Sequence, residues 1–490
     1  MAMTHRENLM LTDEALPVSA ETRSAGDRRT RVTAATMLTI YLVLLFAVPS
    51  YVTIGPLGGL GRPSVLWGLL LLFWWVLAWL QERSTPVHPV VQPVRYLFAA
   101  FVVVALVSFA AAMMRGQPAD QISPATTALV RLASWSGVLL VAIDGIRTHS
   151  DAAKLVRRLA VAGIALAALG LAQFFTGQSL LEWVGSIPGL SADSGDVATR
   201  GSFTRAAATA THPLEYGTAV VASLPLVITA AVHRGFHRSP ARSSAWWWAG
   251  VGIILMASLV TVSRSALIGL TVALVASLPS IPKAYRLLVA TGGGIIAAAV
   301  FAFIPGMLGT IMNLFLGASD DPSTQSRTAA LARVPGFIAS SPLIGQGFGT
   351  FLPRYYIFDN GWVLLTVEVG ILGVVTLVGF SLTAMGSAIW ASLHSPFDET
   401  KAMSRALAAS LLTIAVLLLF FDGFSFPMSA GAFFLIAGLA TAMRGIAASD
   451  EALVLGIERV SRPEIVDDDV SETPPVKADS GPSHREQAEP

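Results

Sequence analysis

Stretches of mostly apolar residues recur along this chain, and each approaches the length that crosses a membrane. A helix needs about 20 predominantly apolar residues to span the hydrocarbon core of a bilayer. Backbone N–H and C=O groups must be satisfied within that core, which restricts a spanning segment to a helix or a closed barrel. Twelve apolar stretches are predicted to span, at 33–54, 64–81, 94–114, 124–146, 158–176, 213–232, 245–262, 265–280, 285–305, 361–385, 404–422 and 427–444. We therefore expect an all-α integral membrane protein with about twelve transmembrane helices.

The composition agrees with a membrane protein and excludes some chemistry. Hydrophobic residues make up 54% of the chain and charged residues only 13%, whereas soluble domains average about 25% charged residues. The chain contains no cysteine, which excludes a disulfide or a thiolate site. Histidines and carboxylates are not grouped at metal-ligand spacing. We therefore expect no metal and no cofactor, and we expect no nucleic-acid partner.

The distribution of basic residues predicts the orientation of the chain. Five arginines precede the first apolar stretch: Arg6, Arg23, Arg28, Arg29 and Arg31. When this end is placed inside, every lysine of the chain also falls on the inner side, in agreement with the positive-inside rule. Twelve spans would then leave both termini in the cytoplasm.

The two ends of the chain are polar. Residues 1–32 and 445–490 contain few large apolar residues, and the second segment is rich in acidic residues. Such segments cannot bury enough apolar surface to fold alone. We expect two disordered cytoplasmic tails that flank one polytopic membrane domain at 33–444.

Two long loops are predicted on the outer side, at about 177–212 and 306–360. The second loop contains Asp321-Pro322-Ser323, which is typical of a helix start. The residues that follow on one helical face are Arg327, Leu331, Val334 and Ile338. We expect a short surface helix here with Arg327 near its start, followed by a flexible turn at the glycine-rich run 345–349.

Three arginines at the predicted outer membrane edge are candidates for phosphate binding. An arginine in apolar sequence is costly unless it meets water, a phosphate or a carboxylate. Arg264 lies between two apolar stretches, Arg327 lies in the second loop, and Arg205 precedes the run T-H-P-L-E-Y-G. The alternatives are that Arg264 reaches the lipid head groups and that Arg327 and Arg205 belong to solvated surfaces.

Carboxylates near the tenth predicted span are candidates for proton transfer. Asp359 stands at the start of this span, and Glu368 follows nine residues later, about 13 Å deeper along a helix. Either carboxylate could accept a proton from a reacting hydroxyl, although Asp359 could instead cap the helix. Three residues are weaker candidates for substrate contact: His212, Glu215 and Asn360.

Four segments of the chain resemble the O-antigen ligase and O-antigen polymerase family of bacterial envelope enzymes. They are S-R-S-A at 263–266, Arg327 followed by P-L-I-G-Q-G-F-G-T-F at 342–351, D-N-G-W-V-L-L-T-V-E-V-G-I-L-G at 359–373, and R-A-A-A-T-A-T-H-P-L-E-Y-G at 205–217. The resemblance implies a metal-independent, inverting glycosyltransferase in the bacterial cytoplasmic membrane. Such an enzyme would act at the external face on glycans carried by undecaprenyl diphosphate.

The resemblance also assigns roles and partners. Arg264 and Arg327, with Arg205, would hold the diphosphate, and Asp359 or Glu368 would take the proton of the acceptor hydroxyl. The partners would be a polyprenyl-diphosphate-linked oligosaccharide, membrane lipid, a glycan or lipid acceptor, and other polysaccharide export proteins.

Two alternatives remain open. Many family members carry histidine where this chain has Asp359, which favours a polymerase over a ligase without excluding either. A polytopic transporter or a lipid or polysaccharide flippase belongs to another class, and it would place ionisable groups or broken helices near the bilayer midplane.

Overall fold

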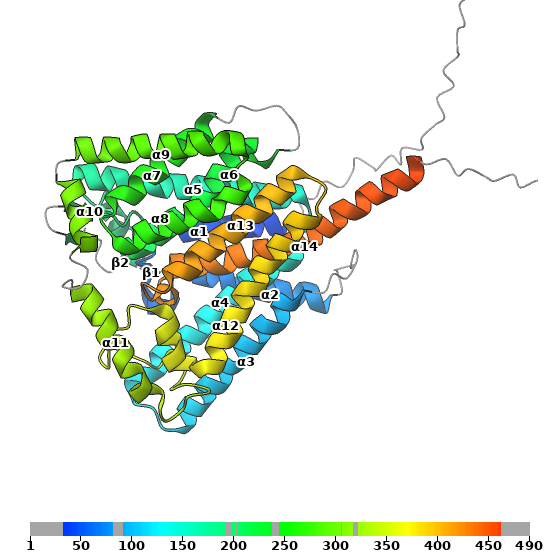
Figure 1. Ribbon diagram of the computed structural model, residues 1–490. Helices are drawn as coiled ribbons and strands as arrows, with labels where there is room; N and C mark the ends of the chain where they lie inside the picture. Colours follow the sequence, from blue (N-terminus) through cyan, green and yellow to red (C-terminus); the bar gives the residue numbers. More distant parts are fainter. Residues whose placement is uncertain are drawn as a thin grey trace, which may run out of the picture.

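The computed structural model describes residues 33–81, 92–192, 198–200, 203–237, 245–304, 306–316 and 322–461. These residues form a helical bundle with two small antiparallel sheets (Figure 1). The α-helices are α1 (Ala34–Phe46), α2 (Pro63–Leu80), α3 (Pro93–Met114), α4 (Ala119–Gly145), α5 (His149–Thr176), α6 (Pro213–Val232), α7 (Ala245–Val260), α8 (Arg264–Ser277), α9 (Lys283–Phe303), α10 (Met307–Leu316), α11 (Pro322–Ile338), α12 (Gly361–His394), α13 (Asp398–Leu417) and α14 (Pro427–Ser461).

Short 3-10 helices and strands lie between the long helices. The 3-10 helices are η1 (Gly55–Leu60), η2 (Glu182–Ser186), η3 (Arg234–Phe236), η4 (Leu278–Ser280) and η5 (Gly423–Ser425). The strands are β1 (Val52–Ile54), β2 (Leu190–Ala192), β3 (Ala198–Arg200) and β4 (Phe203–Arg205), which pair as β1 with β2 and β3 with β4.

The expectation of a multi-pass, all-α membrane protein is confirmed. Within the described ranges, nine helices are long and apolar enough to cross a membrane: α2, α3, α4, α5, α6, α9, α12, α13 and α14. The other three predicted spans correspond to the shorter apolar helices α1, α7 and α8. The count of twelve therefore stays a prediction, although every predicted span overlaps a helix; the first, 33–54, extends beyond the end of α1 at Phe46.

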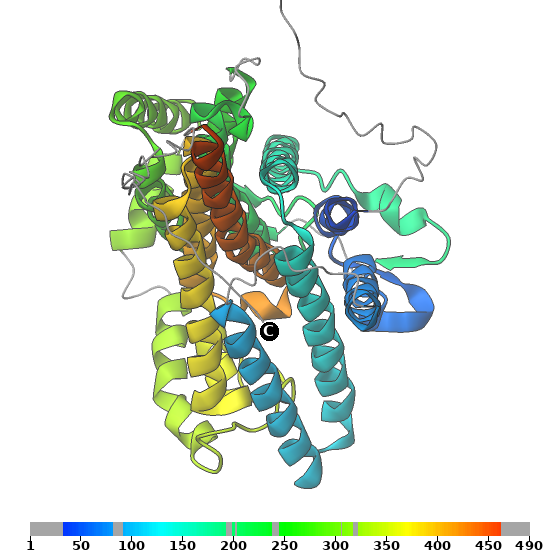
Figure 2. The same ribbon diagram turned by 90° about the vertical axis from the view of Figure 1, so that its right-hand side faces the viewer.

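Two helices form the centre of the bundle. In α6, 94% of the most apolar stretch is buried, and in α14 the fraction is 89%. Helix α6 packs against α5, α7, α8 and α13, and α14 packs against α4, α12 and α13. Figure 2 shows α14 (orange to red) between α12 (yellow) and α4 (cyan). At the edge, only 6% of the apolar stretch of α9 is buried, as expected of a helix that faces lipid.

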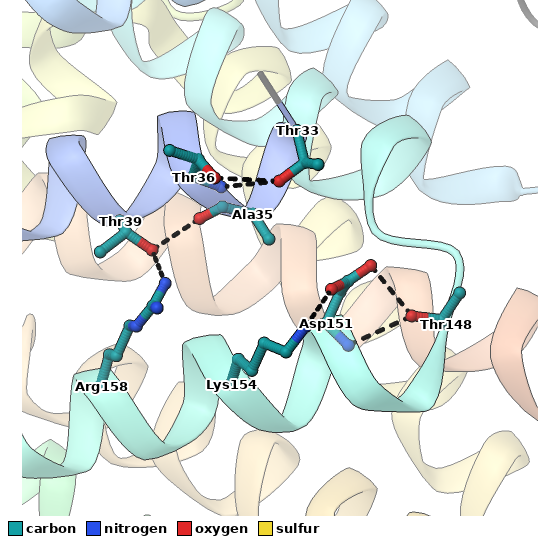
Figure 3. A network of polar contacts seen from close by, with 8 residues as sticks. All are labelled: Thr33, Ala35, Thr36, Thr39, Thr148, Asp151, Lys154 and Arg158. Atoms are coloured by element: carbon teal, nitrogen blue, oxygen red, sulfur yellow. Dashed lines mark hydrogen bonds and ion pairs between the residues drawn. The ribbon is translucent and has the colours of Figure 1, made fainter. Parts of the chain in front are cut away.

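Helices α1 and α5 begin side by side and run in the same direction (Figure 3). Each start is capped by a threonine: Thr33 Oγ1 accepts the N–H of Thr36 (3.2 Å), and Thr148 Oγ1 accepts the N–H of Asp151 (3.2 Å). Arg158 of α5 donates to a hydroxyl on α1. This shared direction agrees with the predicted order of spans, in which the first and the fifth both run outward.

Helix α12 is interrupted at Gly370, where φ is 68° and ψ is −173°. A Cβ atom at this position would lie 2.3 Å from the carbonyl carbon of Leu343, so only glycine fits. The segment 342–347 pairs with the interrupted turn. Its hydrogen bonds run from Gln346 N to Val367 O (2.8 Å), from Gly347 N to Glu368 O (3.0 Å) and from Ile371 N to Pro342 O (3.0 Å).

The glycine-rich run 345–349, predicted as a flexible turn, is instead enclosed between three helices. A Cβ atom on Gly345 would lie 2.3 Å from the carbonyl oxygen of Glu368 in α12. On Gly347 it would lie 2.4 Å from Ala112 Cβ in α3, and on Gly349 it would lie 2.4 Å from Ala128 Cβ in α4. All three glycines have positive φ. Close packing and the positive φ values together explain why glycine occupies these positions.

The predicted helix in the second long loop is present as α11. Val334 and Ile338 of the predicted face pack inward as expected, whereas Leu331 is 57% exposed. Ala330 is buried instead and packs with Phe358 and Val367. The small side chain of Ala330 lets the helix approach α12 closely.

The predicted boundary of the C-terminal tail at residue 445 is wrong, because α14 continues to Ser461. Asp450 explains the extension: it is buried and accepts hydrogen bonds from Thr400 Oγ1 (3.0 Å) and Ser395 Oγ (3.4 Å). The predicted tail residues 1–32 and 462–490 lie outside the described residues.

Candidate functional site

A cavity of about 460 Å³ lies between α3, α4, α12 and α14, and residues of the segments 348–359 and 421–426 complete its lining. Its size is in the range of small-molecule sites. Most of its wall is aromatic or aliphatic, with Phe101, Trp135 and Phe434 among the lining residues. The charged or titratable residues that line it are Arg131, His212, Asp359, Glu368 and Asp422, together with Tyr356.

The fold brings together two of the predicted site residues, Asp359 and Arg327. Asp359 lines the cavity, and its Oδ2 lies 3.8 Å from Nε of Arg327. The Arg327 guanidinium is held by a hydrogen bond from Nη2 to the carbonyl of Phe420 (3.0 Å). The Asp359 side chain is 38% exposed and that of Arg327 26%. Helix α11 therefore carries an arginine to the rim of the cavity.

Asn360, and not Asp359, caps α12. The Asn360 Oδ1 atom accepts the backbone N–H groups of Trp362 (3.0 Å) and Val363 (3.2 Å), which is the usual hydrogen bonding of an N-cap residue. The helix-cap alternative for Asp359 is therefore wrong. Asn360 itself does not line the cavity in the described structure.

Glu368 and Asp422 also line the cavity. The Glu368 side chain is buried, and its backbone carbonyl accepts the N–H of Gly347 (3.0 Å) and the hydroxyl of Ser108 (2.7 Å). The Asp422 carboxylate accepts the hydroxyl of Ser425. Burial raises the pKa of Asp422, while the bond from the Ser425 hydroxyl opposes that rise.

Arg131 and Asp422 are cavity residues that the sequence analysis did not select. Arg131 comes from within α4 and lies within electrostatic reach of Asp422 and of Arg62. Its enclosed Nε atom makes no hydrogen bond in the part of the chain that the structure describes. The signal in the sequence was an arginine well inside an apolar span, which is costly without a partner.

The remaining predicted residues lie at or outside the cavity wall. His212 lines it, and Arg205, at the end of β4, lies within electrostatic reach of His212. Arg264 is the first residue of α8. Neither Arg264 nor Arg205 is among the described residues that line the cavity.

Glu215 joins three segments of the chain. It is fully buried, and its carboxylate accepts the hydroxyl of Ser50 (3.1 Å), the N–H of Thr211 (2.8 Å) and the N–H of Met428 (2.7 Å). It does not line the cavity as described. These contacts favour a structural role for Glu215 at the start of α6. They give no support to the predicted contact between Glu215 and the substrate.

His212 provides a test of the site through pH. Its Nδ1 accepts the N–H of Leu214 (3.1 Å) and so caps α6. Burial of the ring lowers the pKa of His212, the Arg205 guanidinium lowers it further, and the Asp359 carboxylate partly opposes both. The unfolded chain then binds a proton more readily than the folded protein. The contribution of His212 to the free energy of unfolding should be complete above about pH 6.5, the usual pKa of histidine. It should be lost as the pH drops toward the lower pKa of His212 in the folded protein.

Replacing His212 with asparagine should remove this dependence, because asparagine caps a helix without titrating. We expect the thermal midpoint in detergent to drop less between pH 7.5 and pH 5.5 in His212→Asn than in the parent protein. Equal drops in the two proteins would show that His212 does not gain a proton on unfolding.

Comparison with known proteins gives a family match for part of the chain. Residues 249–378 match the family model described as O-antigen ligase. A comparison with curated proteins finds no match. The matched range includes Arg264, Arg327, Asp359 and Glu368, whereas Arg131, His212 and Asp422 come from other parts of the chain. Residues 249–378 of this multi-pass membrane protein therefore belong to the O-antigen ligase family, and the resemblance seen in the sequence is confirmed.

Proposed function

We propose that the protein is a metal-independent, inverting glycosyltransferase that polymerises or ligates glycans carried on undecaprenyl diphosphate. The family supports the coarser statement that this is a glycan-processing enzyme of the bacterial envelope. The observation that carries the finer proposal is Asp359, which lines an apolar-walled cavity and lies 3.8 Å from Arg327. A carboxylate can accept the proton of the attacking hydroxyl, and an adjacent arginine can stabilise the charge on the leaving diphosphate.

Asp359 is the best candidate for the base among the cavity carboxylates. The Glu368 side chain is buried, and the Asp422 carboxylate already accepts the hydroxyl of Ser425. Asp359 keeps 38% of its side chain exposed. In the proposed reaction the acceptor hydroxyl attacks the anomeric carbon, and its proton passes to the Asp359 carboxylate.

Arginines would stabilise the leaving group. As the bond between the anomeric carbon and the diphosphate breaks, the electron pair stays on the diphosphate, and cationic donors already in place stabilise that charge. We assign this role first to Arg327, with Arg131 as an additional donor from within the cavity. Arg264 and Arg205 stay candidates for the same role from outside the cavity wall.

The walls of the cavity suit the two halves of such a substrate. Aromatic and aliphatic side chains, including Phe101 and Phe434, would lie against the polyprenyl chain. Tyr356 lines the cavity near Asp359 and lies under the guanidinium of Arg333 (4.9 Å). An aromatic ring in this position could stack on a sugar of the glycan.

The break in α12 is the feature that favours the alternative, a transporter or flippase. Broken helices in transporters leave backbone groups available for an ion or a substrate. Here the groups beside Gly370 bond to the segment 342–347 and to Ser108, whose hydroxyl donates to the carbonyl of Glu368 (2.7 Å). The backbone groups at the break are therefore already bonded within the protein rather than left for an ion or a substrate. We favour the enzyme over the transporter or flippase for this reason.

The proposed orientation, with both termini in the cytoplasm of a bacterial cell, can be tested at the two ends of α5. Cysteines introduced as Ser150→Cys and Gln178→Cys fall on exposed residues in a chain without native cysteine. In intact spheroplasts, an impermeant maleimide should label only residue 178, and permeabilised cells should show both. Labelling of residue 150 alone would reverse the orientation and remove the external active site.

The enzymatic proposal is tested with purified protein in lipid nanodiscs. A polyprenyl-diphosphate-linked oligosaccharide should be converted into a longer or transferred glycan, and a chelator should not stop the reaction. Movement of the intact lipid-linked substrate across a proteoliposome membrane, without any new glycosidic bond, would support the transporter.

A further inference from the structure

Glu215 joins the backbones of two segments that line the cavity. One oxygen of its carboxylate, Oε2, accepts the N–H of Thr211 (2.8 Å), the residue before His212. The other oxygen, Oε1, accepts the N–H of Met428 (2.7 Å), two residues after Phe426. His212 and Phe426 both line the cavity, and their rings lie 5.8 Å apart. The carboxylate therefore bridges the backbone on both sides of a contact in the cavity wall.

Ser50 fixes the carboxylate from a third segment of the chain. Its hydroxyl donates to Glu215 Oε2 (3.1 Å) and lies 2.9 Å from the hydroxyl of Thr211. Its N–H donates to the carbonyl of Thr209 (2.8 Å). Glu215 is fully buried, and a buried charged acceptor that loses its donors is costly. The three bonds to the carboxylate therefore resist separation of the segments that they join.

The segment 418–428, which we call the wall segment, extends from Glu215 to Arg327. Near its start, the carbonyl of Phe420 accepts a hydrogen bond from Arg327 Nη2 (3.0 Å). The carbonyl of Leu418 accepts the first N–H of α12 (2.8 Å). The last residue of the wall segment donates its N–H to Glu215. The wall segment is thus bonded to Arg327 near one end and to Glu215 at the other.

Internal contacts make the wall segment compact. The N–H of Gly423 donates to the carbonyl of Phe421 (2.9 Å), and the N–H of Phe426 donates to the carbonyl of Gly423 (3.3 Å). The rings of Phe421 and Phe426 lie 5.9 Å apart, and the hydroxyl of Ser425 donates to the Asp422 carboxylate. A displacement of either end would therefore move the residues between them, which line the cavity.

From these contacts we infer that Glu215 is a positioning residue. It fixes one end of the wall segment, and through that segment it sets the place of the Arg327 guanidinium, without touching the substrate. The kinetic consequence rests on the proposed function, whereas the structural consequence does not. Glu215→Gln is the sharpest probe because the amide keeps the size of the side chain but its NH₂ group cannot accept. At least one of the N–H groups of Thr211 and Met428 then loses its acceptor.

Hydrogen–deuterium exchange measures the wall segment without turnover. We expect the amides of residues 418–426 to exchange about tenfold faster in Glu215→Gln than in the parent protein, since bonds to a buried charged group are lost. None of the described hydrogen bonds joins these amides to Glu215 itself. Glu182→Gln, an exposed change of the same chemistry, should leave their exchange unchanged. Unchanged exchange at 418–426 in Glu215→Gln, whatever happens at residues 211 and 428, would overturn the inference.

Ser50→Ala is a second variant in case Glu215→Gln does not fold. It removes one of the three bonds to the Glu215 carboxylate and keeps the two from backbone N–H groups. We expect a smaller rise of the exchange rate at 418–426 in the same direction. No rise in this variant would also count against the inference.

A double-mutant cycle separates positioning from general support of the fold. If Glu215 acts through Arg327, Glu215→Gln should lower kcat by about tenfold in the parent protein. The loss should be much smaller in the Arg327→Ala background, because the two changes then share one effect. The pH profile of kcat should keep its shape. An equal loss in both backgrounds would contradict positioning through Arg327. If the protein transfers no glycan at all, the exchange result still decides whether Glu215 holds the wall segment.

Discussion

Replacing Asp359 with asparagine should lower the turnover number by about 10²–10⁴-fold. Asparagine keeps the size of the side chain and a hydrogen-bond acceptor but cannot take a proton at neutral pH. Asn360, and not Asp359, caps α12, so the change should leave the start of that helix intact. The assay is extension or transfer of a polyprenyl-diphosphate-linked oligosaccharide by purified protein in nanodiscs.

A matched control for Asp359→Asn is Asp120→Asn. Asp120 is an aspartate in the first turn of α4, which pairs with Arg354 away from the cavity lining. Asp120→Asn should retain most of the activity, and both variants should show the same thermal midpoint as the parent within a few degrees. If Asp359→Asn turned over within about threefold of the parent, far less than the loss of a general base, Asp359 would not be the base.

Replacing Arg327 with alanine should lower kcat by about 10²–10³-fold, the cost of removing one donor from a site that stabilises developing charge. Lysine should restore only part of the loss, because it keeps the charge but loses the fork of N–H groups that binds two phosphate oxygens. The Arg327→Ala variant also removes the guanidinium whose Nε lies 3.8 Å from the Asp359 carboxylate. Single-turnover rates at saturating substrate would isolate this effect from weaker binding.

Arg333 offers a control on the same helix. It lies on α11, carries the same charge, is exposed and stacks over Tyr356 at 4.9 Å. Arg333→Ala should change kcat much less than Arg327→Ala. Similar losses in both variants would indicate that α11 contributes general positive charge rather than a specific phosphate contact.

Much of the fold could be predicted because the relevant signals are local. The length of each apolar stretch decides whether it can span a bilayer, and every predicted span overlaps a helix. The start of α11 was visible in a proline and a polar cap pattern. The C-terminal boundary was missed because α14 is extended by a tertiary contact, from Asp450 to Thr400, that polar composition does not reveal.

The site could be predicted only in part because it is assembled from distant segments. Asp359 and Arg327 are 32 positions apart in sequence and were selected for separate reasons, and the fold places them 3.8 Å apart. Arg131 comes from α4 and Asp422 from the turn before η5, and both lie outside the matched family range. Glu368 lines the cavity as a candidate base would, but its side chain is buried, whereas that of Asp359 is 38% exposed, and the sequence does not reveal this difference.

The most direct test of glycosyl transfer in this cavity is the number of polyprenyl diphosphate molecules released for each glycosidic bond formed. Purified protein in nanodiscs, given a lipid-linked oligosaccharide of defined anomeric configuration, should release one diphosphate carrier for each new bond and invert the anomeric centre. Asp359→Asn should abolish both the release and the bond formation together. Bond formation with the carrier still attached to the transferred glycan, or retention of configuration, would contradict direct displacement of the diphosphate by an activated acceptor.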